Sequence, residues 1–372
     1  MRTRLGCVAL GFALLLGACG DPSSPSADPG LGPGPGGTGG APEVTPALPW
    51  PLTQFPALPE IARDVPAARV ELGNLLFYDP ILSIDKETAC ATCHSEFWGM
   101  GDALPLAVGH GAGPLAGPGR EGPNTLRRNS PALFNIAFRE TLNWDGKAAS
   151  LEEQAMMPLR ASDELDLDPE QAVLELKEIP EYVELFAEAF PDNPAVTAAN
   201  LASALASFQR TMVSDRSLYD AYTRGQTRVL DEELVEGMFL FAEMGCSDCH
   251  TPPLFESETF VNRYVPQADI EVDQGRAEVT GLADDLGAFR TPTLRNAFDT
   301  EPYFHNGSVK ELSDAVRHEL EQSGMPFTDD DVRLLERFIA EALRDDSRSA
   351  VRPRNVPSGL PTPLDGAIFP GR

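Results

Sequence analysis

The feature that most constrains the fold of this 372-residue chain is a pair of Cys-x-x-Cys-His motifs. The motif residues are Cys90, Cys93 and His94 in the first copy, and Cys246, Cys249 and His250 in the second. This pattern is the attachment signal for c-type haem, because two thiols on one short turn reach both vinyl groups of a porphyrin. The adjacent His then lies under the iron as an axial ligand. The sequence therefore predicts two covalently bound haem c groups, with one proximal His each.

The same four thiols could instead form a zinc site, a redox dithiol or disulfides. Four zinc-binding thiolates would not require a His after each pair. A redox dithiol would be expected in a βαβ context, which this sequence lacks. Two complete motifs, with no structural Cys left over, favour haem attachment.

The N-terminus resembles a secretion signal rather than part of a fold. Residues 1–18 begin with a short positive region and continue as an apolar run too short to span a bilayer. The run leads to Cys19 in a segment that resembles the lipobox of bacterial lipoproteins, where the Cys carries the lipid. The alternative is an ordinary cleaved signal with an incidental Cys. Residues 19–50 are rich in Pro and Gly and are expected to form a flexible tether. We therefore expect an exported, membrane-anchored lipoprotein that faces the periplasm and contacts the membrane only through its lipid.

The chain is strongly acidic, with a formal net charge of −28. This charge argues against nucleic acid or an anionic membrane surface as a partner. It favours a basic partner, such as a small electron-donor protein. The alternative is that the charge only keeps the protein soluble and self-repelling.

Apolar residues at helical spacing predict an all-α fold. Three such stripes lie within residues 201–212, 231–244 and 328–343. Since each half of the chain carries one motif, we expect two cytochrome-c-like haem domains in one chain. The predicted parts are an N-terminal haem domain at residues 51–214, a C-terminal haem domain at residues 215–346 and a surface tail at residues 347–372. A Gly- and Pro-rich loop at residues 109–123 interrupts the first domain, and a loop of this length is expected to be functional or mobile.

Further segments accompany the two motifs. They are Glu71–Pro80, Val108–Gly111, Arg128–Pro131, Asn143–Gly146, Leu151–Ala155, Gly275–Arg276, Thr291–Asn296 and Pro302–Gly307. With these segments the chain resembles the bacterial dihaem cytochrome c peroxidases and their MauG-type relatives. The resemblance implies reduction of hydrogen peroxide with electrons from a small donor protein, such as a cytochrome c or a copper protein. The alternatives are a MauG-type oxidase that modifies a side chain of a partner protein, and a plain electron-transfer dihaem cytochrome. Whether the protein forms a homodimer stays open.

The resemblance also implies roles for individual residues in peroxide cleavage. Glu164 would take and return a proton, and Gln154 would orient the peroxide. Trp144 would lie between the haems and relay an electron. His110 would cap the first haem iron in the resting enzyme and leave when the second haem is reduced, and its flanking glycines suit a loop that moves. Asn143 stands where peroxidases commonly have an aromatic residue, which makes this pocket more polar.

The second haem departs from the family pattern. Its sixth ligand is Met in the peroxidases and Tyr in the MauG-type enzymes, but the matching position here is Glu319, with His318 just before it. Glu319, His318 or Met325 could ligate the iron, or the site could be open. A His or carboxylate ligand would give the haem a lower potential than Met does.

Other positions imply contacts beside the haems. His305 is expected to form hydrogen bonds near the second haem rather than to ligate its iron. Asn129, Thr300 and Pro302 match positions that bind calcium between the domains in the family. They would use side-chain or carbonyl oxygens, which calcium prefers.

Overall fold

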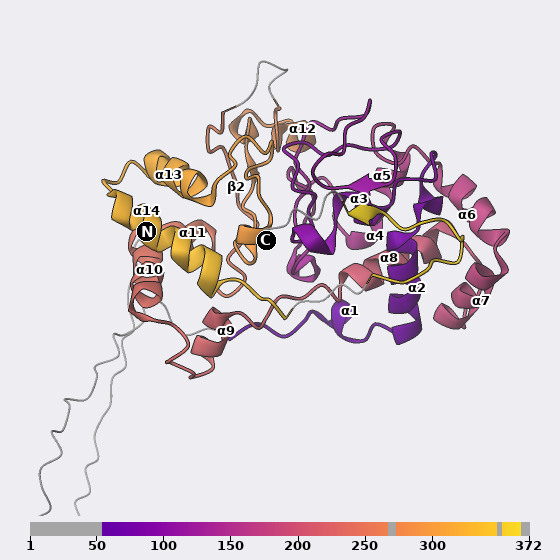
Figure 1. The fold of residues 1–372 in the computed structure, drawn as a ribbon, viewed down its shortest axis with the longest axis horizontal. Helices are drawn as coiled ribbons and strands as arrows, with labels where there is room; N and C mark the ends of the chain where they lie inside the picture. Colours follow the sequence, from indigo (N-terminus) through magenta and orange to yellow (C-terminus); the bar gives the residue numbers. More distant parts are fainter. Residues whose placement is uncertain (1–53, 267–272, 348–351, 366–372) are drawn as a thin grey trace, which may run out of the picture. The chain divides into compact units, whose positions relative to one another are not determined.

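The computed structural model describes residues 54–266, 273–347 and 352–365. One compact unit spans Leu48–Arg372, whereas Cys19, the predicted signal and the predicted tether lie outside the described residues. The described part is mostly helical and contains two small two-stranded sheets (Figure 1). This confirms the predicted all-α fold. Within these ranges, no helix combines the length and the apolarity needed to cross a bilayer.

The first half of the chain contributes eight α-helices within the described residues. They are α1 Glu60–Arg63, α2 Ala67–Tyr78, α3 Cys90–Cys93, α4 Leu151–Ala155, α5 Met157–Arg160, α6 Pro169–Lys177, α7 Pro180–Ala189 and α8 Ala198–Gln209. Short 3₁₀ helices occur at Pro80–Leu82, Glu96–Trp98 and Ile136–Phe138. The first Cys-x-x-Cys-His motif therefore forms a helical turn of its own, at α3.

The second half contains the remaining described helices. They are α9 Leu218–Thr223, α10 Glu232–Glu243, α11 Cys246–Cys249, α12 Ala277–Thr280, α13 Leu312–Ser323 and α14 Asp329–Arg337, which continues as a π-helix at Phe338–Ala342. Short 3₁₀ helices occur at Ala283–Asp285 and Ala297–Asp299. The strands are β1 Leu115–Ala116, β2 Phe260–Val261, β3 Phe289–Arg290 and β4 Leu364–Asp365. Strand β1 pairs with β4 in parallel, and β2 pairs with β3 antiparallel.

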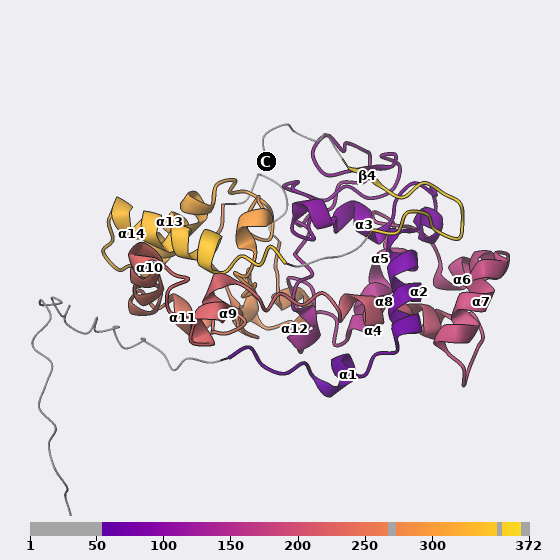
Figure 2. The same ribbon diagram turned by 60° about the horizontal axis from the view of Figure 1, so that its bottom comes forward.

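The first hydrophobic core is built around α2 and α8, which lie side by side (Figure 2). Leu76 of α2 is fully buried, as are Leu201 and Leu205 of α8. The predicted stripe at residues 201–212 is therefore confirmed as part of this core. The two helix backbones approach so closely that a Cβ added at Gly73 would lie 2.0 Å from the Ala204 carbonyl oxygen.

We expect Gly73→Ala to destabilise the folded protein. A methyl group has no room beside Ala204, so the helices must separate, which costs about 1–3 kcal/mol in overpacked cores. Urea unfolding of the haem-loaded protein measures the change. Glu71→Ala, on the exposed side of the same helix, is the control and should stay within about 0.5 kcal/mol of wild type. A Gly73→Ala variant as stable as wild type would contradict the close contact.

The second core is built around α10, α13 and α14, which lie together (Figure 1). Gly237 of α10 allows another close approach, since a Cβ there would lie 2.5 Å from the Leu334 carbonyl oxygen. Thr328 caps the N-terminus of helix α14. The Thr328 side chain accepts from the Asp331 N–H at 3.2 Å, and the Asp331 carboxylate accepts from the Thr328 N–H at 2.7 Å. Leu335 on the same helix is buried, which confirms the predicted apolar stripe.

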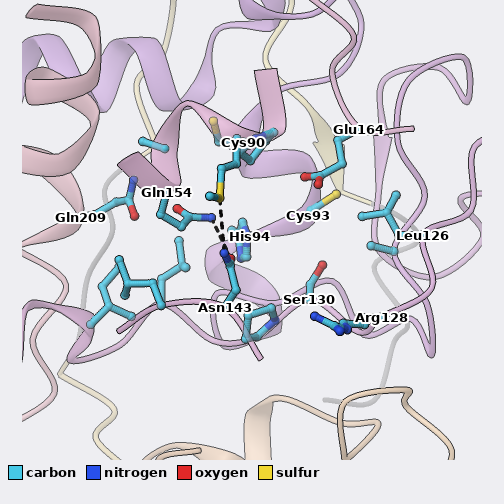
Figure 3. Close-up of a pocket in the computed structure, with 18 of the residues that line it drawn as sticks. Cys90, Cys93, His94, Leu126, Arg128, Ser130, Asn143, Gln154, Glu164 and Gln209 are labelled. Carbon is cyan, nitrogen blue, oxygen red and sulfur yellow. Dashed lines mark hydrogen bonds between the residues drawn. The ribbon is translucent and has the colours of Figure 1, made fainter. Parts of the chain in front are cut away.

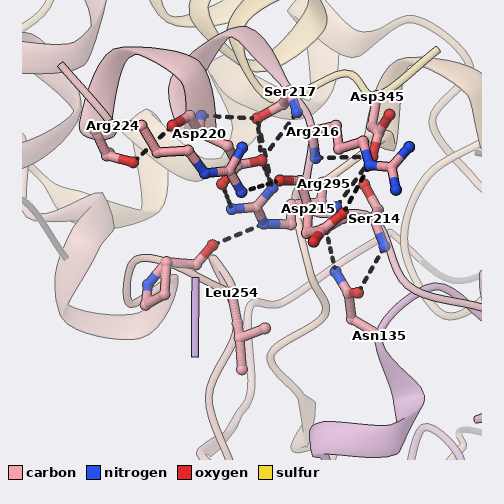
Figure 4. A network of polar contacts seen from close by, with 12 residues as sticks. Asn135, Ser214, Asp215, Arg216, Ser217, Asp220, Arg224, Leu254, Arg295 and Asp345 are labelled. Carbon is pink, nitrogen blue, oxygen red and sulfur yellow. Dashed lines mark hydrogen bonds and ion pairs between the residues drawn. The ribbon is translucent and has the colours of Figure 1, made fainter. Parts of the chain in front are cut away.

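A buried polar network connects the chain segments between the two cores (Figure 4). Ser214 donates its N–H to Asn135 at 2.9 Å and accepts from the Asn296 amide at 2.8 Å. Next to it, Arg295 forms a two-point ion pair with Asp220, with both N–O distances 2.7 Å. Apart from Val356 of the C-terminal tail, the first core consists of residues up to Met212, and the second begins at Tyr219. Because one compact unit contains both cores, the division into haem domains at residues 214 and 215 stays a prediction.

The C-terminal tail packs against the first half of the chain. Strand β4 pairs with β1 in the loop 109–123, with Leu364 opposite Leu115. Val356 is 5% exposed and belongs to the first core. The Arg352 guanidinium forms an ion pair with Glu96 at 2.9 Å. The sequence predicted only a surface tail. The structure shows that the tail also contributes a side chain, that of Val356, to the first core.

Candidate functional site

The first Cys-x-x-Cys-His motif lines a pocket in the first half of the chain (Figure 3). Cys90 and Cys93 are free thiols at the two ends of α3. Burial raises the pKa of the Cys90 thiol to about 12 and also raises that of Cys93. Nδ1 of His94 donates to the Met100 carbonyl oxygen at 3.0 Å, which leaves Nε2 available for a metal. Burial lowers the pKa of His94 and keeps the imidazole neutral, the form that binds metal.

The second motif is arranged in the same way in the second half. Cys246 and Cys249 lie at the ends of α11, and both line a second pocket with His250. Nδ1 of His250 lies 3.0 Å from the Pro292 carbonyl oxygen and 3.2 Å from that of Phe255, so Nε2 is again left free. Burial lowers the pKa of His250 to about 4 and raises that of Cys246 to about 12. Both motifs therefore present two thiols and one neutral imidazole to a pocket.

The two pockets have features expected of cofactor sites. The second has a volume of about 680 Å³, within the range of about 300–1,000 Å³ for ligand pockets. The first has a smaller volume, about 190 Å³. Each pocket is lined by a buried side chain with a polar atom unpartnered within the described residues, Oε1 of Gln209 in the first and Nε2 of His305 in the second. Buried polar atoms usually have partners, so these atoms and the thiol–imidazole sets fit a covalently bound haem.

Two amide side chains line the first pocket, those of Gln154 and Asn143. Gln154, on α4, donates from Nε2 to Oδ1 of Asn143 at 3.4 Å. Asn143 in turn donates from Nδ2 to the Met157 sulfur at 3.5 Å. Figure 3 shows both amides beside the first motif. The amide of Gln154 is thus held by the amide of Asn143. Asn143 stands at the position where an aromatic residue was expected from the family.

Glu164 lines the same pocket as Gln154 and the first motif (Figure 3). Burial raises its pKa to about 7, the negative charge of Asp163 adds to the rise, and Lys147 opposes it. Its carbonyl oxygen accepts from the His110 N–H at 2.8 Å, which ties this segment to the loop 109–123. A carboxyl group with a pKa near neutrality can both accept and return a proton.

The structure does not bring His110 into the pocket. Its Nε2 lies 3.2 Å from the Ser162 carbonyl oxygen and 2.9 Å from Nδ2 of Asn124. The loop that carries it is held by Arg120, which is 3% exposed and donates to the Gly109 carbonyl oxygen at 2.6 Å. In this arrangement the first pocket is bordered by the His110 loop but not by its imidazole.

Trp144 lines both motif-bearing pockets. Its indole N–H donates to the Asn129 carbonyl oxygen at 2.9 Å, and its own carbonyl oxygen accepts from the Arg290 N–H at 2.9 Å. One contact comes from each half of the chain. A single aromatic side chain therefore borders both sites.

Of the three candidate ligands for the second haem, the structure places only Glu319 in the pocket lining. Its carboxylate forms an ion pair with Nε of Arg263 at 2.7 Å. His318 donates from Nε2 to the Arg263 carbonyl oxygen at 2.8 Å. Met325 follows the end of α13 and is 40% exposed.

The three residues matched to calcium positions come together at a small cavity. Asn129, Thr300 and Pro302 line it with Trp144. Asn129 donates from Nδ2 to the Leu104 carbonyl oxygen at 2.8 Å, so its Oδ1 faces away from that bond. Within the described ranges, no group of three or more His, Cys, Asp or Glu could hold a metal. An ion in this cavity would therefore depend on neutral oxygens, which calcium accepts.

Three pocket residues were not identified from the sequence. Gln209 follows Leu205 by one helical turn on the buried face of α8, and a polar residue on an apolar stripe is a signal that could have found it. Arg128 lines the first pocket and forms an ion pair with Asp273 of the second half at 2.7 Å. The third residue is Arg263, and the sequence around it contains no pattern that would mark it as a pocket residue.

The sequence of this chain is similar to those of known di-haem proteins. A family model described as "Di-haem cytochrome c peroxidase" matches residues 67–228. The cytochrome c551 peroxidase of Pseudomonas aeruginosa is 38% identical over 252 residues, which cover 66% of this chain and 70% of that protein. The methylamine utilization protein MauG of Methylorubrum extorquens is 33% identical over 258 residues, or 69% of this chain and 70% of MauG. A second cytochrome c551 peroxidase, from Nitrosomonas europaea, is 31% identical and covers 80% of this chain and 86% of its own length.

Solved structures share the fold. A MauG-like protein associated with microbial copper homeostasis aligns with a TM-score of 0.67 at 24% identity, over 82% of this chain and 95% of its own. The diheme peroxidase BthA from Burkholderia thailandensis aligns with a TM-score of 0.63 at 21% identity, over 84% of this chain and 94% of its own. At these identities the likeness concerns the fold.

Proposed function

Because the chain belongs to the di-haem cytochrome c peroxidase family, we propose that it reduces hydrogen peroxide to water with electrons from an external one-electron donor. The observation that carries this proposal is the first pocket. It combines a Cys-x-x-Cys-His motif with a buried carboxyl group whose pKa is about 7 and with an orienting amide. A plain electron carrier needs neither group, so the pocket favours an enzyme.

Membership of the family implies haem c as cofactor. In this proposal the thiols of both motifs would hold the porphyrins, and His94 and His250 would bind the iron through their free Nε2 atoms. The bound haem supplies the iron at which the O–O bond is broken. All proton handling and orientation then fall to side chains of the first pocket.

Glu164 is the proposed acid–base group of the first pocket. Ionised Glu164 takes the proton of the peroxide oxygen that approaches the metal and returns it to the oxygen that leaves as water. Gln154, fixed by Asn143, donates a hydrogen bond that orients the peroxide. With two electrons and two protons, one hydrogen peroxide gives two molecules of water.

Trp144 is the proposed path for electrons between the pockets, since it lines both. The electron donor would be a small cytochrome c or copper protein, and the acidic charge of the chain favours a basic one. His110 is proposed to be the movable cap of the first site. The structure then corresponds to the arrangement in which its imidazole lies outside the pocket.

We further propose an exported protein in the periplasm, anchored by a lipid on Cys19. Calcium is proposed for the cavity lined by Asn129, Thr300 and Pro302, next to Trp144. An ion there would hold the chain segments that border both haem sites.

A steady-state assay tests the function on holoprotein matured in a host that attaches haem c. After one-electron reduction, addition of hydrogen peroxide should oxidise reduced donor, with two donor molecules consumed per peroxide. Reactions without peroxide and with the Cys90→Ala/Cys93→Ala variant are the controls. Absence of peroxide-dependent oxidation with every cytochrome c and copper protein tried would contradict the proposal.

The second candidate is a MauG-type oxidase of a partner protein. It is favoured by the MauG relative at 33% identity and by Glu319 at the second pocket. This activity requires an oxidised state that persists until the partner arrives. If the spectrum after peroxide addition stays changed for minutes without a donor, the oxidase is supported, whereas rapid return to the resting spectrum supports the peroxidase.

A further inference from the structure

The carboxylate of Glu319, held by Arg263, lines the second pocket. It stands at the position where the related peroxidases have a Met thioether and the MauG-type enzymes a Tyr phenolate. We propose that Glu319 supplies the second axial ligand of the iron in the Cys246–His250 pocket, and that Arg263 positions it. The inference rests on the haem occupancy required by the proposed function, but not on peroxide turnover.

Helix α13 directs Glu319 toward the pocket. The residues of α13 that line the pocket are Leu312, Ala315, Val316, Glu319, Leu320 and Ser323. Their spacing of three to four residues defines one face of the helix. Glu319 is the charged member of this face, and the other five are apolar or small. The motif itself lies on α11, so α13 forms a separate wall of the pocket.

Arg263 fixes the position of this carboxylate. Its Nε forms an ion pair with Oε2 of Glu319 at 2.7 Å, and its Nη2 donates to the Glu319 carbonyl oxygen at 3.0 Å. His318 bonds back to the Arg263 carbonyl oxygen at 2.8 Å. Two successive residues of α13 are thus tied to one residue of the facing segment. Among the described residues, Oε1 of Glu319 has no hydrogen-bond partner, so one oxygen stays available for a metal while the other is held.

The two other candidates from the sequence are less well placed. Nε2 of His318 is bonded to the Arg263 carbonyl oxygen, and the ring packs edge-on against Phe304, with ring centroids 5.1 Å apart. It does not line the pocket, and neither does Met325, which is 40% exposed. Reaching the pocket would require either side chain to leave its present surroundings.

A carboxylate ligand has a direct electrochemical consequence. Axial ligand identity sets the potential of a haem, and Met gives a high value. An anionic oxygen stabilises the ferric state more than a neutral sulfur does, since it offsets the extra positive charge. The neighbouring guanidinium of Arg263 limits this effect. The second haem should therefore be harder to reduce than a Met-ligated one.

Spectroscopy of the oxidised holoprotein tests the assignment, with the first haem as an internal reference. In Glu319→Met, the EPR signal of one haem should change and its midpoint potential should shift upward in a spectroelectrochemical titration. Glu319→Gln, which keeps the shape but loses the charge, should change the same signal. Arg263→Gln should split that signal into several populations, and Arg263→Lys should restore a single one, because the cation is regained. Glu321→Gln, an exposed acid on the same helix, should leave spectrum and potential unchanged.

Two results would overturn the assignment. One is an unchanged EPR signal and midpoint potential in both Glu319 variants. The other is loss of the wild-type ligand signature in His318→Gln or Met325→Leu, or in a variant of another side chain that lines the pocket, namely His305→Gln, Tyr303→Phe or Met244→Leu. Peroxide turnover is measured on the same preparations. A wild-type protein without turnover, but with a second-haem signal that depends on Glu319, would defeat the proposed function and support the ligand.

Discussion

Glu164→Gln lowers the rate of peroxide reduction by about 10²–10⁴-fold, the contribution typical of a general acid–base group. The amide keeps the size of the side chain but cannot accept the peroxide proton. Stopped-flow mixing of the half-reduced holoprotein with hydrogen peroxide measures the step. Haem content and the EPR spectrum should stay as in wild type, which separates lost proton transfer from lost cofactor.

The pH dependence of the wild type gives an independent check on Glu164. Its pKa is raised to about 7 by burial and by Asp163, and the base must be ionised to act. The rate should therefore rise as the pH increases through about 7 and level off above it, and Glu164→Gln should lose this step. Asp163→Asn is the matched control, because it removes a neighbouring negative charge but leaves the base. It should keep most of the rate and move the midpoint to lower pH. A Glu164→Gln variant with the wild-type rate and profile would rule out this role.

Arg295→Met destabilises the protein by about 3–5 kcal/mol, the effect of leaving one partner of a buried ion pair uncompensated. Arg295 and Asp220 have side chains 0% and 1% exposed, and they are joined at two points (Figure 4). The guanidinium also donates to the Pro253 carbonyl oxygen at 2.7 Å. Denaturant unfolding of the haem-loaded protein measures the loss.

The double variant Arg295→Met/Asp220→Asn gives the control for this prediction. It removes both charges, so it should be less destabilised than Arg295→Met alone if the unpaired carboxylate is the cause. Arg333→Met, in an exposed ion pair with Glu233, should be close to wild type. A change for Arg295→Met of no more than about 0.5 kcal/mol, as at ordinary surface sites, would show that the pair does not stabilise the fold.

Features that depend on local spacing were accessible from the sequence. The helices at residues 232–243 and 329–337 follow from apolar stripes, because burial of one helix face depends only on the order of residues along that helix. The two motifs are recognised by their spacing alone. Gln154, Glu164 and Trp144 were expected from the family resemblance, and all three line the first pocket.

Features that depend on contacts between distant segments were not accessible. Arg263 reaches Glu319 across 56 residues, and no local pattern records that pairing. The choice between Glu319 and His318 depends on the rotation of α13, which only the packing of the helix decides. His110 lies outside the pocket because of contacts with Ser162 and Asn124, in two other segments.

The pairing of β4 with β1, and the burial of Val356 in the first core, have a consequence for the order of folding. Residues 352–365 supply contacts that the first core lacks until they are synthesised. That core therefore completes its packing only after the second half of the described chain has been made. A chain cut short before residue 352 would leave its first core open on one side, even with every helix of that core already made.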